Sequence, residues 1–78
     1  MATKLEQAVE FLKHDNWKVV EPPIGKFARV EKTYKTGTVK IERIDLYGVQ
    51  SQSPAWEYFR DDKMAADGNT LETLKQIL

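Results

Sequence analysis

Hydrophobic residues near the start of the chain recur with the spacing of an amphipathic helix. Positions i, i+3, i+4 and i+7 define one apolar stripe, and its members are Leu5, Ala8, Val9 and Leu12. Thr3 and Glu6 fit a capping box, in which each side chain accepts the backbone N–H of the other residue. Asn16 tolerates the left-handed conformation that ends many helices. We therefore predict a helix over residues 3–15.

A second apolar stripe lies at the other end of the chain and predicts a helix over residues 69–78. Its members are Leu71, Leu74, Ile77 and Leu78. Asn69 precedes Glu72 by three residues, again a capping-box arrangement, and Thr70 is an alternative cap. A helix of about ten residues is not stable alone in water. This helix must therefore dock on the rest of the molecule.

Residues 27–47 are rich in β-branched and aromatic residues and predict a β-hairpin. Thr36 and Gly37 form the expected turn, because glycine adopts a positive φ without steric cost. Residues 17–20 predict a short strand, and the two prolines that follow it indicate a connector or a sheet edge.

The register of this hairpin is expected to pair Tyr34 with Val39. That register sets Glu31 opposite Glu42, an unfavourable pair of like charges. The apolar positions also change parity beside Arg43, which indicates a β-bulge or a strong local twist near Glu42.

A further strand is predicted over residues 55–60, which hold the three aromatic residues Trp56, Tyr58 and Phe59, the first two at alternate positions. Residues 61–68 are charged and rich in turn formers, with room for a short element at 64–66. The chain thus predicts a single α+β domain over residues 1–78. Its expected order is αβββα, with an antiparallel sheet of three to four strands and both helices on one face of the sheet.

The composition excludes several classes of site. There is no cysteine among the 78 residues, so disulfides, thiolate nucleophiles and cysteine-ligated metals are excluded. No glycine-rich phosphate loop occurs, and we expect no cofactor. No signal peptide and no apolar run of membrane-spanning length are evident. We therefore expect a cytoplasmic protein without a membrane partner, placed in the host cytoplasm if a phage encodes it.

Catalytic machinery is not evident either. His14 is the only histidine, and at the end of a helix it is expected to be solvated. Asp61, Asp62 and Asp67 suggest a calcium loop, but the position of its terminal glutamate is taken by Leu74. We predict that the chain is not an enzyme and holds no metal.

Charge is balanced overall but unevenly distributed. The chain has 12 basic and 12 acidic residues, yet residues 18–43 hold seven basic residues against three acidic ones. From residue 57 onward five acidic residues stand against three basic ones. A basic hairpin suits contact with phosphates, although lysines on edge strands also serve to prevent strand pairing between molecules.

These features favour a small protein-binding module, such as an inhibitor, adaptor or accessory subunit of the kind that phages and mobile elements encode. The alternatives are nucleic-acid binding through the basic hairpin and association with a second copy of the chain. Candidate partner-binding residues are Lys26, Arg29, Lys32, Lys35, Lys40 and Arg43 in the hairpin, Gln50 and Gln52 in the following loop, and Asp61 and Asp62 in the acidic segment.

Overall fold

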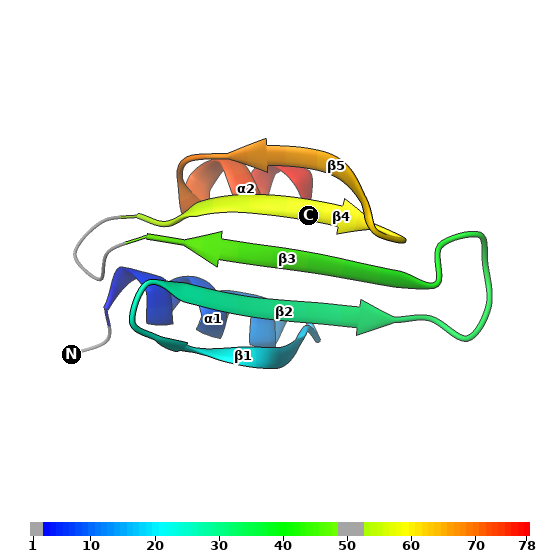
Figure 1. Cartoon of the computed structure of the whole chain (residues 1–78), viewed down its shortest axis with the longest axis horizontal. Coiled ribbons are helices and arrows are strands. Elements are labelled where there is room, and N and C mark those ends of the chain that lie inside the picture. The colour runs from blue at the N-terminus through cyan, green and yellow to red at the C-terminus, as the bar shows by residue number, and fades with distance from the viewer. Residues whose placement is uncertain (1–2, 49–52) are drawn as a thin grey trace.

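The computed structural model describes residues 3–48 and 53–78, and these form an α+β fold with one antiparallel sheet (Figure 1). The elements in chain order are α1 (Lys4–His14), β1 (Lys18–Ile24), β2 (Phe27–Thr33), β3 (Ile41–Tyr47), β4 (Ala55–Arg60), β5 (Lys63–Gly68) and α2 (Leu71–Ile77). Each strand pairs with the next one along the chain, in the order β1-β2-β3-β4-β5. The sheet in these residues has five strands, which corrects the expected number of three to four.

The additional strand is β5. Asp61 and Asp62 form a tight turn with φ values of 50° and 67°, and the chain then returns along β4. Aspartate tolerates this left-handed conformation better than most residues. The sequence left room only for a short element at 64–66, because this strand lies at a sheet edge, is mostly exposed and lacks a hydrophobic pattern.

The first strand is also longer than predicted, since β1 continues through Pro22 and Pro23 to Ile24. Proline has no N–H to donate, and an edge strand leaves one side of its backbone without a partner strand. The pairing of β1 with β2 contains two register shifts around Glu21. The prolines therefore mark a sheet edge, which was one of the two expected outcomes.

The predicted register of the β2–β3 hairpin is wrong by one residue. Thr33 pairs with Ile41, and Glu31 pairs with Arg43 instead of Glu42. A loop over residues 34–40 replaces the tight turn and absorbs the difference, although Gly37 does have a positive φ of 105°. No register shift interrupts this ladder, so the expected bulge is absent from it. Burial of the same face along both strands, and not the turn, sets the register.

Helix α1 matches the prediction closely. The side chain of Thr3 accepts the N–H of Glu6 at 3.1 Å, and Glu6 Oε1 accepts the N–H of Thr3 at 3.4 Å. Asn16 follows the helix with a φ of 69°. The capping box and the left-handed residue thus define both ends of the helix.

Helix α2 differs from its prediction in length and in the extent of its buried face. It begins at Leu71 after the cap Thr70, which was the alternative to Asn69. Leu74 is fully buried, but Ile77 and Leu78 are 41% and 44% exposed. The predicted apolar stripe is therefore buried only in its first half.

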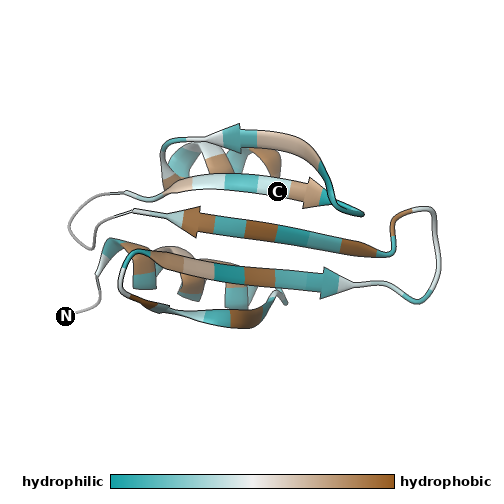
Figure 2. Ribbon diagram, in the orientation of Figure 1, coloured by the Kyte–Doolittle hydropathy of each residue, from teal (hydrophilic) through white to brown (hydrophobic). Residues whose placement is uncertain are grey.

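Both helices cover the same face of the sheet and lie behind it in Figure 1. The strand residues in the core all point to that face, and they are Ala28, Val30, Ile44, Leu46 and Trp56. They pack with Leu5, Leu12 and Leu74 of the helices. Hydrophobic residues alternate with hydrophilic ones along β2 and β3 (Figure 2). Because both helices lie on one face, the other face has no covering layer in the described part of the chain.

Candidate functional site

The face of the sheet opposite the helices carries the most distinctive set of side chains. Strand alternation and the cross-strand pairs place its members on one surface, here named the uncovered face. They are Lys18, Glu21, Ile24, Phe27, Arg29, Glu31, Thr33, Ile41, Arg43, Asp45, Tyr47, Ala55, Glu57, Phe59, Met64 and Asp67. Five carboxylates and three basic groups give this face a formal excess of two negative charges.

Asp45 is at the centre of the uncovered face and is only 2% exposed. Arg29 donates to both of its carboxylate oxygens, from Nε to Oδ1 at 2.8 Å and from Nη2 to Oδ2 at 3.2 Å. This two-point hydrogen bond to Asp45 raises the pKa of Arg29. A buried carboxylate requires such partners, because burial without them costs several kilocalories per mole.

Arg43 approaches Asp45 from the neighbouring position on β3. Its Nε lies 3.4 Å from Asp45 Oδ1, close enough for an ion pair but without hydrogen-bond geometry. Arg43 Nη1 also lies 3.5 Å from the carboxylate of Asp62. One guanidinium therefore links the buried carboxylate to an exposed carboxylate at the sheet end.

Aromatic rings support both arginines on the uncovered face. The guanidinium carbon of Arg43 lies 4.3 Å from the ring centre of Phe59, and that of Arg29 lies 5.3 Å from the ring centre of Phe27. Phe27 in turn contacts Tyr47, with ring centres 5.2 Å apart. Contacts of this kind restrain the orientation of the flat guanidinium groups.

Tyr47 connects the buried Asp45 with Glu57 on the uncovered face. Its hydroxyl donates to Asp45 Oδ2 at 3.4 Å. Burial raises the pKa of Tyr47, and hydrogen bonding to Glu57 and the nearby charge of Asp45 raise it further. The phenol therefore stays neutral and remains a donor, while 41% of the residue is exposed.

The basic residues of the predicted hairpin do not form one surface. Lys26 lies in the turn between β1 and β2, whereas Lys35 and Lys40 lie in the loop at the opposite end of β2 (Figure 1). Lys32 faces the helices, 4.8 Å from the ring centre of Trp17 and 3.3 Å from Asp15. Arg29 and Arg43 are on the uncovered face, so these six cations are divided among several surfaces.

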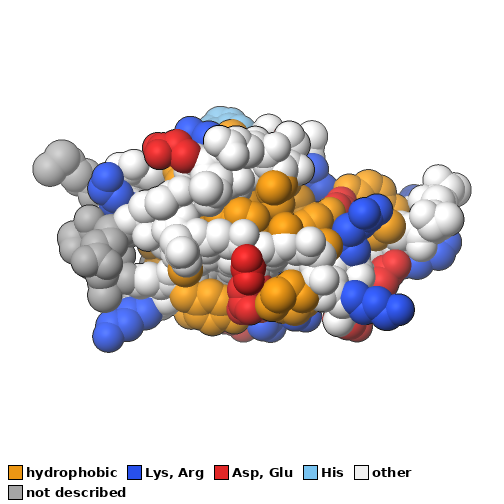
Figure 3. All heavy atoms as spheres, turned by 90° about the horizontal axis from the view of Figure 1, so that it is seen from above, with side chains coloured by type: hydrophobic (Ala, Val, Ile, Leu, Met, Phe, Trp, Pro, Cys, Tyr) orange, Lys and Arg blue, Asp and Glu red, His pale blue; other side chains and the backbone are white. Residues whose placement is uncertain are grey.

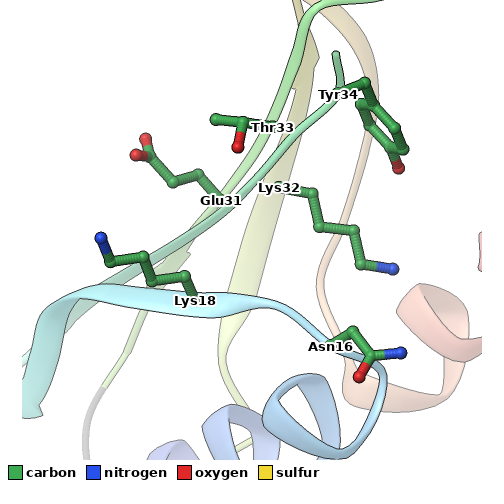
Figure 4. A pocket seen from close by; sticks show the side chains of 6 residues that line it. All are labelled: Asn16, Lys18, Glu31, Lys32, Thr33 and Tyr34. Atoms are coloured by element: carbon green, nitrogen blue, oxygen red, sulfur yellow. The ribbon is translucent and has the colours of Figure 1, made fainter. Parts of the chain in front are cut away.

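A hollow of about 470 Å³ at the edge of β1 and β2 has two lysines in its wall, and they lie on opposite sides of the strands (Figure 4). Lys18 and Glu31 point to one side of the strands, and Lys32 and Asn16 point to the other. Each lysine lies near a carboxylate, since Lys18 is paired across the strands with Glu31 and Lys32 binds Asp15. The hollow therefore lacks a concentrated positive charge.

The remaining predicted contact residues have distinct environments. Asp61 Oδ1 accepts the N–H groups of Lys40 and Ile41, each at 3.0 Å, and so ties the β4–β5 turn to the hairpin loop. Asp62 is exposed and pairs with Arg43. Gln50 and Gln52 lie outside the described residues.

A separate polar cluster lies on the helix-covered side, where Tyr34 and Tyr58 both donate their hydroxyls to Glu42. The hydrogen bond to Glu42 raises the pKa of Tyr34. His14, the only histidine, is exposed in the last turn of α1. Over residues 3–48 and 53–78, no three acidic or histidine side chains gather as metal ligands would, and no helix there could span a membrane.

Sequence reasoning missed the residue at the centre of the uncovered face. Asp45 stands between the buried residues Ile44 and Leu46, and a lone carboxylate within an apolar run is a signal of a paired charge. The alternation of Phe27 with Arg29, and of Arg43 with Tyr47, would have identified the side of the sheet that meets solvent.

Comparisons of this chain with protein-family models, with curated proteins and with solved structures found no match.

Proposed function

We propose that this chain is a protein-binding module that acts through the uncovered face of its sheet. The observation that carries the proposal is the buried Asp45 with two arginines fixed around it on an otherwise uncovered surface. Arginine, tyrosine, phenylalanine and methionine are among the side chains enriched at protein interfaces. This face presents all four of them.

Rigidity supports the same function. Binding is weakened when long side chains lose rotamer freedom on contact. Arg29 and Arg43 are already restrained by Asp45 and by the rings of Phe27 and Phe59. Binding of a partner therefore costs little further side-chain entropy at these two arginines, because folding has already restrained them.

The distribution of the hairpin cations favours a protein partner over nucleic acid. A phosphate backbone is best contacted by a continuous basic stripe. Lys26 is separated from Lys35 and Lys40 by the length of β2, and Lys32 is on the side of the helices. Nucleic-acid binding remains the alternative that the experiment below distinguishes.

The test is capture of a partner by tagged protein, with variants on each side of the sheet. Tyr47→Ala and Met64→Ala change exposed residues of the uncovered face, and Ile77→Ala is the matched control on α2. Thermal melting first establishes that all three variants fold. We expect capture of one defined protein, resistant to nuclease, by the wild type and the control but not by the face variants.

Two other results would reject this function. Equal capture by all the variants would mean that the uncovered face is not the contact surface. Recovery of nucleic acid that disappears at high salt would instead identify phosphate contacts as the source of affinity.

A further inference from the structure

The two edges of the sheet differ in their capacity to accept another strand. At one edge, β1 contains Pro22 and Pro23, which cannot donate hydrogen bonds, and its pairing with β2 is irregular. At the other edge, β5 (Lys63–Gly68) contains no proline, and its pairing with β4 has one register shift, between Met64 and Ala66. An antiparallel strand at an edge directs alternate N–H and C=O groups outward. No other described segment hydrogen-bonds to the backbone of β5 on that side.

Side chains beside this edge indicate the charge of the segment that would fit. Glu57 and Asp67 are direct cross-strand neighbours, a like-charge arrangement that destabilises a sheet. Neither carboxylate forms an ion pair with a described lysine or arginine. A hollow of about 450 Å³ adjoins both, with Tyr47 on its wall. A cationic side chain in the next position of this row would relieve the repulsion.

The view of the molecule from the β5 side agrees with this arrangement. In Figure 3, white backbone and polar atoms cross the middle of the surface, and acidic side chains stand between hydrophobic ones along one margin. Met64 is 51% exposed and belongs to the same side of β5 as Asp67. An added strand would thus meet an apolar position and an acidic position on its uncovered side.

We infer that the outer edge of β5 accepts an extended segment of a partner protein as a sixth strand, with a lysine or arginine beside Asp67 and Glu57. This inference rests on the proposed protein-binding function and identifies the chemistry of one part of the partner. Backbone hydrogen bonds supply the attachment, as in other cases of strand addition. The cation and its apolar neighbour supply the selectivity.

A second copy of the chain fits this edge less well. Paired residues in an antiparallel ladder lie on the same side of the sheet. Lys63 pairs with Arg60 on the helix-covered side, whereas Asp67 is on the uncovered side. Pairing of two β5 strands would therefore leave Lys63 apart from the Asp67 of the other copy, and the carboxylates would keep their repulsion.

The test is an NMR titration of the isotope-labelled chain with three synthetic peptides. The first alternates valine and threonine around one central arginine, the second has glutamate in place of that arginine, and the third is the first peptide N-methylated at alternate residues. We expect amide shifts centred on β5 with the first peptide, and affinity at least about tenfold lower with the other two.

Charge variants of the protein make the test specific. Asp67→Lys should lower the affinity for the arginine peptide by about tenfold and raise the affinity for the glutamate peptide. Glu72→Lys is the control, because it makes the same charge change at an exposed position of α2. Absence of binding, equal affinity for the N-methylated peptide, or equal effects of the two variants would overturn the inference.

These outcomes are separable from failure of the proposed function. If the natural partner is lost in Tyr47→Ala while the peptide leaves β5 unaffected, the uncovered face stands and the edge inference fails. If the arginine peptide binds β5 while the face variants retain the partner, the edge stands and the proposed contact surface is wrong.

Discussion

Arg29 and Asp45 form a two-point ion pair across β2 and β3, with Nε–Oδ1 and Nη2–Oδ2 distances of 2.8 and 3.2 Å. The carboxylate is only 2% exposed although it is on the face that the helices leave uncovered, and Arg29, Arg43 and the Tyr47 hydroxyl contact it there. The pair thus holds the Arg29 guanidinium and the Asp45 carboxylate in fixed positions on that face.

Loss of this pair should destabilise the fold measurably. Asp45→Asn leaves Arg29 and Arg43 without their shared carboxylate, and we expect a loss of about 1–3 kcal/mol in the free energy of unfolding. This expected loss is smaller than the loss from breaking a fully buried ion pair, because the side chain of Arg29 is about one-third exposed. Asp67→Asn at an exposed position is the control, and urea unfolding is the measurement. Equal midpoints for both variants would contradict a stabilising role for Asp45.

The core beneath the helices gives a second prediction. Leu12 and Leu74 are fully buried, so Leu12→Ala and Leu74→Ala should each cost about 2–5 kcal/mol. Ile77→Ala removes an exposed side chain of the same helix and should cost less than about 1 kcal/mol. Thermal unfolding followed by circular dichroism measures all three. Wild-type melting of the two leucine variants would mean that the helices dock differently.

Gly68 is required by a close approach to the core. An alanine Cβ there would lie 2.6 Å from the ring of Trp56 and 2.7 Å from Thr73 Oγ1. We expect Gly68→Ala to cost about 1–3 kcal/mol through overpacking and to alter tryptophan fluorescence. Asn69→Ala, at the exposed neighbouring position, should leave both properties close to wild type. A Gly68→Ala protein as stable as Asn69→Ala would show that this contact relaxes freely.

Asp61 and Asp62 offer a matched pair for testing the connection between two loops. Both have positive φ values, so alanine introduces similar backbone strain at each. Only Asp61 accepts the N–H groups of Lys40 and Ile41. Asp61→Ala should therefore cost about 0.5–1.5 kcal/mol more than Asp62→Ala and should accelerate amide exchange at Lys40 and Ile41. Unchanged exchange at those two amides would argue against the connection.

We expect the free energy of unfolding to fall in alkaline solution because of two tyrosines, Tyr34 and Tyr47. Hydrogen bonding to Glu42 raises the pKa of Tyr34, and burial raises that of Tyr47. A folded-state pKa above the unfolded value of about 10 means that this stability is complete below about pH 10. It is lost as the pH rises through the folded-state pKa.

The measurement is the urea midpoint as a function of pH for the wild type and for Tyr34→Phe/Tyr47→Phe. The wild type should lose stability more steeply than the variant on the alkaline side of pH 10, because phenylalanine has no proton to release. Parallel profiles would show that the two hydroxyls contribute nothing to the alkaline response.

The helix at the start of the chain was predictable because its determinants are local. Thr3, Glu6 and the apolar stripe lie within a few turns of each other, so their spacing alone indicates the cap, the axis and the buried face. The α+β class and the basic hairpin strands were accessible for the same reason. Each depends on residue types and periods that the chain displays in order.

The number of strands, the hairpin register and the paired charge were decided by tertiary structure. Strand β5 has little hydrophobic pattern and exists because β4 offers it a hydrogen-bonding partner. Glu31 faces Arg43 because the buried residues of both strands must meet the same helices. Arg29 reaches Asp45 across 16 positions of sequence. The sequence by itself determined the local elements, whereas contacts between distant segments, whose energies depend on the assembled sheet, determined the surface that this protein presents.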